Sequence, residues 1–207
     1  TAKEIKYYDS TEESKSLLET VSVDSLLNRE IWRQLPTICQ VLPNDDILPA
    51  RAKYAKMSKN IGVNYVRSSE PIWYTLADCI SSKLLTGKTL QVLQSFTFKP
   101  EGRQEALRTV SLLGNEQYNV EPYDSDLFRR LIELRMQATG DDKLAVKIIA
   151  NATSYGIYIE IITDTAKEHT INFYADSGHK IRLNKDEKAG KYFNPILATS
   201  ITAAARM

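Results

Sequence analysis

Two amphipathic segments separated by only a few residues constrain this chain more than any other feature. Over residues 125–138 large apolar side chains recur at helical spacing, while charged side chains occupy the opposite side. The sequence Thr-Gly-Asp-Asp at 139–142 ends this helix and caps a second one, which runs from 143 to about 155. Two helices joined by so short a turn have to pack against each other in antiparallel orientation. The sequence therefore predicts a helical hairpin over residues 125–155.

The second of these helices carries an unusual polar side. We expect its apolar side to be buried through Leu144, Ile148 and Ala152. A polar row at i, i+4 and i+8 is formed by Lys143, Lys147 and Asn151. Ser154 falls within about 60° of this row, and Tyr155 borders it. One face of this helix thus carries a cation, an amide, a hydroxyl and an aromatic ring, and such a face can bind a polyphosphate and stack beside a base. The alternative interpretation is a polar stripe that is only solvated.

The remaining sequence predicts a mixed fold. Helices are expected at 11–35 (two short ones), 73–85 and from Asn194, an N-cap, to the end; strands are expected at 92–98 and 108–113. Pro43, Pro49 and the turn signal at 44–46 indicate an irregular connection over 39–65. Short β-rich segments at 156–163, 170–174 and 180–183 suggest a small meander. The fold class is therefore α+β, mostly helical, with the two-helix hairpin, a small antiparallel β meander and irregular connections.

Composition narrows the class of protein. The 207 residues include 27 Lys and Arg against 26 Asp and Glu, so the net charge of +1 gives no general attraction to nucleic acid. No apolar run approaches the roughly 18 residues of a membrane span. Two cysteines cannot form a disulfide framework, and we expect a reduced, cytoplasmic protein with no membrane partner. Residues 178–191 hold five basic groups against two acidic ones, which fits a solvated hairpin as well as a phosphate contact.

One further motif carries little chemistry, and the two ends of the chain are informative. Thr86-Gly87-Lys88-Thr89 is similar to the end of a phosphate-binding loop, but the motif needs a glycine where Ser82 stands. The chain lacks an initiator Met and stops at Met207 inside a predicted helix, so we expect it to be a piece of a longer protein.

Several segments resemble family B DNA polymerases. Residues 147–156, Lys-Ile-Ile-Ala-Asn-Ala-Thr-Ser-Tyr-Gly, resemble the fingers-helix motif Lys-x-x-x-Asn-Ser-x-Tyr-Gly of that family. Residues 192–206 are similar to the helix that follows it, with the usual Thr-Ala-x-x-Arg ending, and Arg135 is similar to the arginine of the first fingers helix. Segments 46–54, 73–78 and 83–88 are similar to a bacterial branch of these polymerases.

This resemblance implies a fragment that covers the fingers and the adjoining palm segment. Its parts would be a palm-associated segment or insertion at 1–124, a fingers hairpin at 125–156, and the β meander with a palm helix at 157–207. In the full-length parent, phosphoryl transfer would use Mg²⁺ held by carboxylates outside the fragment. The family's motif Asp-x-x-Ser-Leu-Tyr-Pro is not found in the chain, and Asp164-Thr165-Ala166 only partly matches Asp-Thr-Asp. No catalytic or metal-binding residue is therefore expected here, and the fragment alone is expected to be inactive.

The resemblance also implies partners and binding residues. The expected ligands are a deoxynucleoside triphosphate and a DNA primer-template. The residues expected to bind the nucleotide are Lys147, Arg135, Asn151, Tyr155 and Lys143. The residues expected to bind nucleic acid are Lys180, Arg182, Lys185, Thr202 and Arg206. Two alternatives stay open: a non-catalytic nucleic-acid-binding or scaffolding protein with a polymerase-derived fold, and an unrelated helical interaction module.

Overall fold

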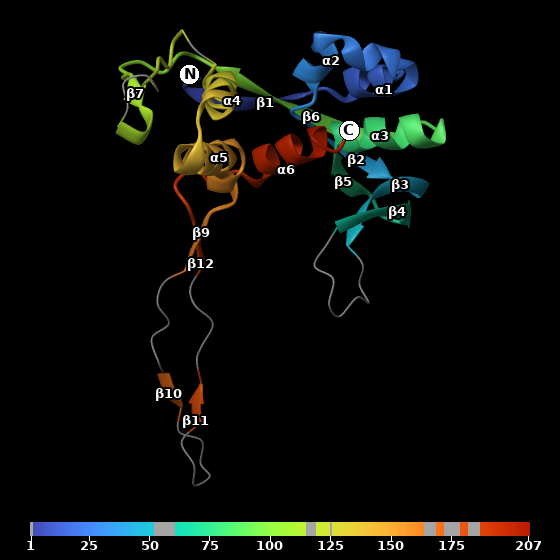
Figure 1. The fold of residues 1–207 in the computed structure, drawn as a ribbon. Coiled ribbons are helices and arrows are strands. Elements are labelled where there is room, and N and C mark those ends of the chain that lie inside the picture. The colour runs from blue at the N-terminus through green and yellow to red at the C-terminus, as the bar shows by residue number, and fades with distance from the viewer. Residues whose placement is uncertain are drawn as a thin grey trace.

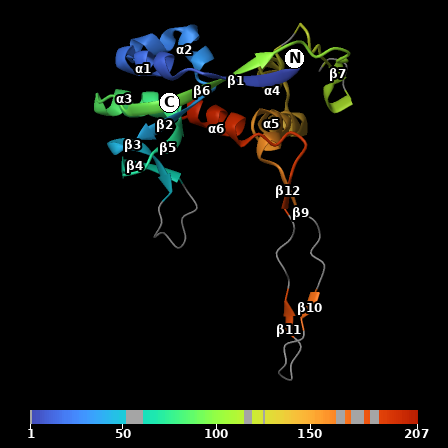
Figure 2. The same ribbon diagram turned by 180° about the vertical axis from the view of Figure 1, so that it is seen from behind.

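The computed structural model describes residues 2–51, 61–114, 119–124, 126–163, 169–171, 179–181 and 187–207. It combines helices with small antiparallel sheets, which confirms the predicted α+β class. Figures 1 and 2 show two bodies side by side: a sheet with helices α1, α2 and α3, and the hairpin of α4 and α5, with helix α6 lying between them.

A four-stranded antiparallel sheet organises the larger body. The strand order is β1-β6-β2-β5. These strands are β1 (Glu4–Asp9), β2 (Thr37–Leu42), β5 (Ile72–Thr75) and β6 (Gln91–Glu101). Alternate residues of β2 are buried, as expected for a strand with one covered face. The predicted strand at 92–98 is confirmed and is longer than expected, whereas β1 was not predicted.

Helices cover one face of this sheet and enclose the main core. They are α1 (Thr11–Thr20), the 3₁₀ helix η1 (Asp24–Leu27), α2 (Arg29–Gln34) and α3 (Leu76–Thr86). Leu18 of α1, Val41 of β2 and Ile80 of α3 are almost completely buried in one apolar cluster. The two short helices expected at 11–35 are thus confirmed, and the helix expected at 73–85 begins only after β5 ends.

The segment expected to be an irregular connection is instead built of strands. After β2, strands β3 (Asn44–Arg51) and β4 (Ile61–Arg67) pair as an antiparallel arm. Pro49 lies inside β3 opposite Val63, and among the described strands β3 pairs with β4 alone. A strand with one free edge tolerates proline, because the missing N–H can lie on the unpaired side.

The predicted helical hairpin is confirmed. Helix α4 (Leu127–Gln137) starts at Asp126, whose carboxylate accepts hydrogen bonds from two backbone N–H groups of the first turn. Helix α5 (Gly140–Ser154) packs against it through a separate small core. The buried residue of α5 is Val146, whereas Leu144 and Ile148 are exposed. The prediction that Leu144, Ile148 and Ala152 form the buried side of α5 is therefore wrong.

Short elements complete the chain. Between the sheet and the hairpin lie β7 (Val110–Ser111), the 3₁₀ helix η2 (Leu112–Gly114) and β8 (Asn119–Val120). The strand expected at 108–113 is thus reduced to two residues. After α5 come the 3₁₀ helix η4 (Gly156–Ile159) and strands β9 (Ile161–Thr163), β10 (His169–Ile171), β11 (His179–Ile181) and β12 (Glu187–Ala189).

These last strands are nested rather than arranged as a meander. Strand β9 pairs with β12 and β10 pairs with β11, so in sequence the first pair encloses the second, and we call these four strands the ribbon (Figure 1). Parts of the predicted segments 170–174 and 180–183 lie outside the described residues. Helix α6 (Pro195–Ala204) then starts at Asn194, which accepts a hydrogen bond from the N–H of Leu197, as predicted. Among the described residues, no helix is long and apolar enough to cross a membrane.

Candidate nucleotide-binding site

The polar row of α5 lies on a flank of the hairpin. The two helices face each other along Leu131 and Leu134 of α4 and Val146 of α5, all fully buried. Lys147 follows Val146 by one residue, and Lys143 and Asn151 are four residues on either side of Lys147. Helical periodicity therefore places these three side chains on one side of the contact line, where they are exposed.

Arg135 lies on the same flank. It follows the buried Leu134 by one residue, as Lys147 follows Val146. In an antiparallel pair of right-handed helices, these two positions project to the same side of the pair. The nearest acid of α4, Glu133, binds Arg129 at 2.9 Å and approaches Arg130 at 3.8 Å. Arg135 is left for other partners.

The three cations on this flank have no acidic partner within the described part of the chain. Arg135, Lys143 and Lys147 are exposed, and none of them forms an ion pair or a side-chain hydrogen bond with another described residue. Three unpaired positive charges on a rigid helical pair attract a polyanion, and a triphosphate is a compact one.

The end of α5 differs from the expectation. The helix stops at Ser154, so Tyr155 is its C-cap residue rather than a member of its polar face. Tyr155 has non-helical backbone angles and a partly exposed ring, and the Ser154 hydroxyl donates to the carbonyl oxygen of Asn151. The Asn151 side chain makes no hydrogen bond within the described structure, which leaves both its donor and its acceptor available.

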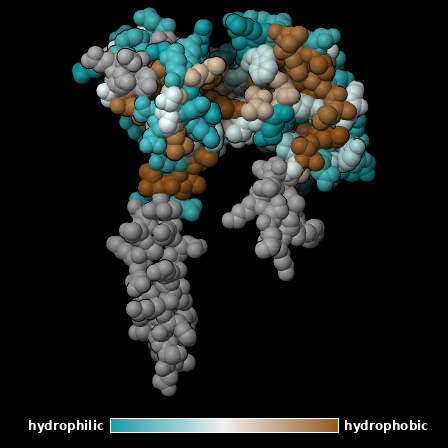
Figure 3. Space-filling view, viewed as in Figure 1, coloured by the Kyte–Doolittle hydropathy of each residue, from teal (hydrophilic) through white to brown (hydrophobic). Residues whose placement is uncertain are grey.

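An exposed apolar row lies next to this polar flank. It consists of Leu144 and Ile148, which are 57% and 59% exposed. Later in the chain, Ile161 and Ile162 of β9 are also about half exposed. Figure 3 shows an apolar surface gathered at the base of the ribbon. The hairpin therefore combines an unpaired basic flank with an apolar outer surface.

The residues expected to bind nucleic acid lie elsewhere. Thr202 is on the exposed side of α6 and Arg206 follows the end of this helix, and both line a groove of about 490 Å³ between the helix and the sheet. Arg206 forms an ion pair with Asp78 of α3. Lys180 lies in β11, and its side chain is outside the description. Arg182 and Lys185 lie outside the described residues.

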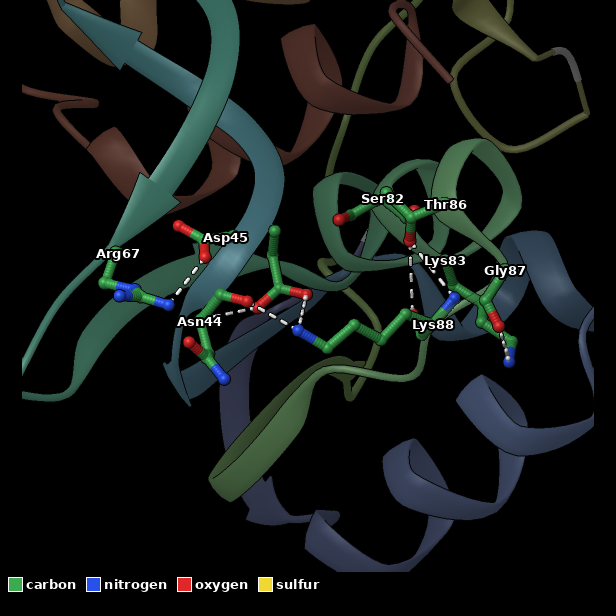
Figure 4. Close-up of polar contacts among 9 residues, drawn as sticks. Asn44, Asp45, Arg67, Ser82, Lys83, Thr86, Gly87 and Lys88 are labelled. Atoms are coloured by element: carbon green, nitrogen blue, oxygen red, sulfur yellow. Dashed lines mark hydrogen bonds and ion pairs between the residues drawn. The ribbon is translucent and has the colours of Figure 1, made fainter.

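The loop at 86–89 has a structural role. It follows the C-terminus of α3, whereas phosphate-binding loops precede a helix N-terminus, where the helix dipole favours an anion. Lys83 donates to the carbonyl oxygen of Gly87 and to the Thr89 hydroxyl, both at 2.9 Å. Lys88 reaches back to the carbonyl oxygen of Asn44 at 2.5 Å (Figure 4). These two lysines tie the end of α3 to its own loop and to the start of β3.

The resemblance seen in the sequence implies Mg²⁺, which acidic side chains would hold. Among the described residues, no three His, Cys, Asp or Glu side chains come together closely enough to hold a metal ion. The acidic side chains of the described residues therefore do not form a ligand set for magnesium.

Comparison with known protein families and with curated proteins gives no match. Among solved structures, the chain is similar to Phi29 DNA polymerase in an orthorhombic crystal form, with a TM-score of 0.36 and 13% sequence identity. The alignment covers 82% of this chain and 26% of the polymerase chain, so this chain spans about a quarter of that protein. A similarity this distant assigns no role to any residue.

The sequence analysis missed one group of side chains. Tyr7, Trp73 and Phe96 come from three different strands, and their rings form a chain of contacts on the sheet. Phe96 and Phe98 are two residues apart in a strand and so face the same side, which is the local signal that such a row leaves in the sequence.

Proposed function

We propose that this chain is the fingers and adjoining palm segment of a family B-like DNA polymerase, and that the α4/α5 hairpin binds the triphosphate of an incoming deoxynucleotide. The observation that supports this most directly is the flank formed by Arg135, Lys143, Lys147 and Asn151, exposed and without ion pairs among the described residues. Lys147 and Asn151 are also the residues that match the polymerase motif.

The chemistry assigned to this flank is electrostatic. Lys147 and Arg135 neutralise phosphate charge, with Lys143 adding a weaker contact nearer the tip of the hairpin. Asn151 and Tyr155 border the nascent base pair, the amide offering hydrogen bonds and the ring a stacking surface. The primer-template contacts Thr202, Arg206, Lys180, Arg182 and Lys185. The carboxylates that bind the catalytic Mg²⁺ belong to other parts of the parent enzyme.

Titration of the chain with dTTP tests this proposal. Lys147→Ala should weaken binding about tenfold or more, because it removes a charge-assisted contact worth about 1.5–3 kcal/mol. Lys143→Ala should weaken binding less. Lys15→Ala is the matched control, since Lys15 is another partly exposed helix lysine, located on α1 and paired with Glu12. If wild type and Lys147→Ala bind dTTP with equal affinity, the hairpin is not the triphosphate site. Binding of oligonucleotides but not of dTTP would favour the non-catalytic nucleic-acid-binding alternative.

A further inference from the structure

The sheet face opposite α1 carries a row of aromatic rings that the proposed function does not use. Tyr7 of β1 meets Phe96 of β6 edge to face, with ring centroids 6.0 Å apart and an interplanar angle of 88°. Phe96 in turn stacks with Trp73 of β5, again at 6.0 Å and with an angle of 21°. The row therefore crosses the whole sheet, spanning β2, which lies between β6 and β5.

This row is open to solvent beside α6. Helix α6 crosses the same face along a neighbouring line, because its residues share cavities with Ile5 and Phe98 at one end and with Ile38 and Thr75 at the other. Tyr7 remains 69% exposed and Trp73 42% exposed. A contiguous row of exposed aromatic rings, unlike rings scattered singly over a surface, is typical of a ligand-binding surface.

Polar groups on this face indicate the chemistry of that ligand. Gln40 of β2 lies directly opposite both Gln94 of β6 and Trp73 of β5, so the two amides share the face with the rings. Both glutamines are half-buried, and neither side chain forms a hydrogen bond with any described residue. Each amide offers two donors and an acceptor beside a π surface. An apolar protein partner would bury these amides without partners, whereas a nucleobase has both a flat ring and a hydrogen-bonding edge.

We propose that this face binds an unpaired nucleic acid strand, with bases stacked on the exposed rings of Tyr7 and Trp73, which Phe96 supports from between them, and with base edges hydrogen-bonded to Gln40 and Gln94. The strand has to be single, because the bases of a duplex are stacked inside it and cannot stack on protein rings. The inference does not depend on the proposed triphosphate site, which lies on the other body of the chain.

Charges on the face set the path of the backbone. Asp9 lies directly opposite Phe96 and is exposed, and the backbone N–H of Thr11, which donates to its carboxylate at 2.9 Å, holds the pKa of that carboxyl below its usual value. Arg206 lines the groove that contains Trp73, is 45% exposed, and uses one of its five N–H groups on Asp78. The phosphates therefore lie on the α6 side of the row, away from Asp9.

Fluorescence anisotropy with a labelled oligothymidylate of about 12 nucleotides tests this proposal on the whole chain at fixed salt. Tyr7→Ala and Trp73→Ala should each weaken binding about fivefold or more, the loss of one stacked base. Asp9→Asn should tighten binding, since it removes a negative charge and keeps the oxygen that accepts from Thr11.

The chain provides a matched control for each aromatic residue. Tyr8 is adjacent to Tyr7 but faces the other side of the sheet, where its hydroxyl donates to Glu101 and Lys99 lies over its ring. Trp32 is an equally exposed tryptophan on α2. Tyr8→Ala and Trp32→Ala should leave affinity unchanged, and circular dichroism should show all variants folded. Trp73→Phe, which keeps a ring, should retain most of the affinity and separates lost stacking from altered folding.

Four outcomes would overturn the proposal. The first is a loss of affinity in Tyr8→Ala and Trp32→Ala as large as in Tyr7→Ala and Trp73→Ala, and the second is no binding of the oligothymidylate. The third is that the same strand binds equally well when it is part of a duplex. The fourth is self-association of the chain that Tyr7→Ala abolishes. The last result would identify a second copy as the occupant of the face. The losses expected for Tyr7→Ala and Trp73→Ala are measured with oligothymidylate and the loss expected for Lys147→Ala is measured with dTTP, so failure of the triphosphate site and failure of this surface are distinguishable.

Discussion

Arg206 donates a hydrogen bond of 3.0 Å to Asp78, joining the end of α6 to the first turn of α3 across 128 residues of sequence. The Asp78 side chain is almost completely buried, and its second oxygen accepts a hydrogen bond of 2.7 Å from the Thr75 hydroxyl. Both carboxylate oxygens are therefore paired. This contact fixes one end of the helix that lies between the two bodies.

Replacement of Arg206 should destabilise the chain. Arg206→Ala leaves the Asp78 carboxylate buried with one oxygen unpaired, and we expect the free energy of unfolding to fall by about 1–3 kcal/mol. Urea denaturation measures this change. Arg33→Ala is the control, because Arg33 pairs with Glu30 on an exposed helix surface and its loss should cost less than about 0.5 kcal/mol. Similar losses in both variants would contradict the assigned role of Asp78.

Gly87 should resist substitution for a backbone reason alone. It ends α3 with φ at +71°, and an added Cβ would meet no atom within 4 Å. Gly87→Ala should therefore lower the free energy of unfolding by about 1–2 kcal/mol through left-handed strain, and Gly87→Asn by less. Gly62→Ala is a matched control, since Gly62 also has open space but no positive φ. A neutral Gly87→Ala variant in a thermal melt would contradict this reasoning.

The buried thiol of Cys79 should make stability depend on alkaline pH. A hydrogen bond with the Cys39 side chain, together with complete burial, raises the pKa of Cys79 well above its ordinary value of 9.0. The thiol is neutral in both states below that value, so its contribution is constant there. Above it the unfolded thiol ionises first, and the free energy of unfolding should fall by up to about 1.4 kcal/mol per pH unit.

Comparison with Cys79→Ala isolates this effect. The wild type should lose stability relative to the variant as pH rises above 9.0 in urea titrations at a series of pH values. Parallel pH profiles for the two proteins would show that Cys79 does not remain protonated in the folded state.

The sequence predicted the elements whose local signals agree with their packing. The start of helix α6 was predicted correctly because Asn194 is its N-cap and Pro195 its first helical residue, and both are local signals. The strands β3 and β4 were missed because Pro49 argues against a strand, and only pairing along a single edge makes that proline acceptable. Such pairing depends on the partner strand, which the local pattern around Pro49 does not report.

The hairpin shows the same limit at the level of one helix face. Helix α5 carries two apolar rows, one through Leu144 and Ile148 and one through Val146, Ile149 and Ala150. Both rows have helical spacing, so periodicity alone does not choose between them. Contact with Leu131 and Leu134 of α4 buries the second row, and this choice also sets which flank carries Lys143 and Lys147.

The choice between these rows can be tested directly. Val146→Ala removes two buried methyl groups and leaves a cavity, so we expect a loss of about 2–3 kcal/mol in the stability of the hairpin. Leu144→Ala removes more apolar surface but from an exposed position, and it should cost less than about 0.5 kcal/mol. Amide hydrogen exchange within α4 and α5 is the appropriate measurement, because the core of the hairpin is separate from that of the sheet. A larger effect of Leu144→Ala than of Val146→Ala would show that α5 is rotated about its axis, with Lys147 away from the proposed site.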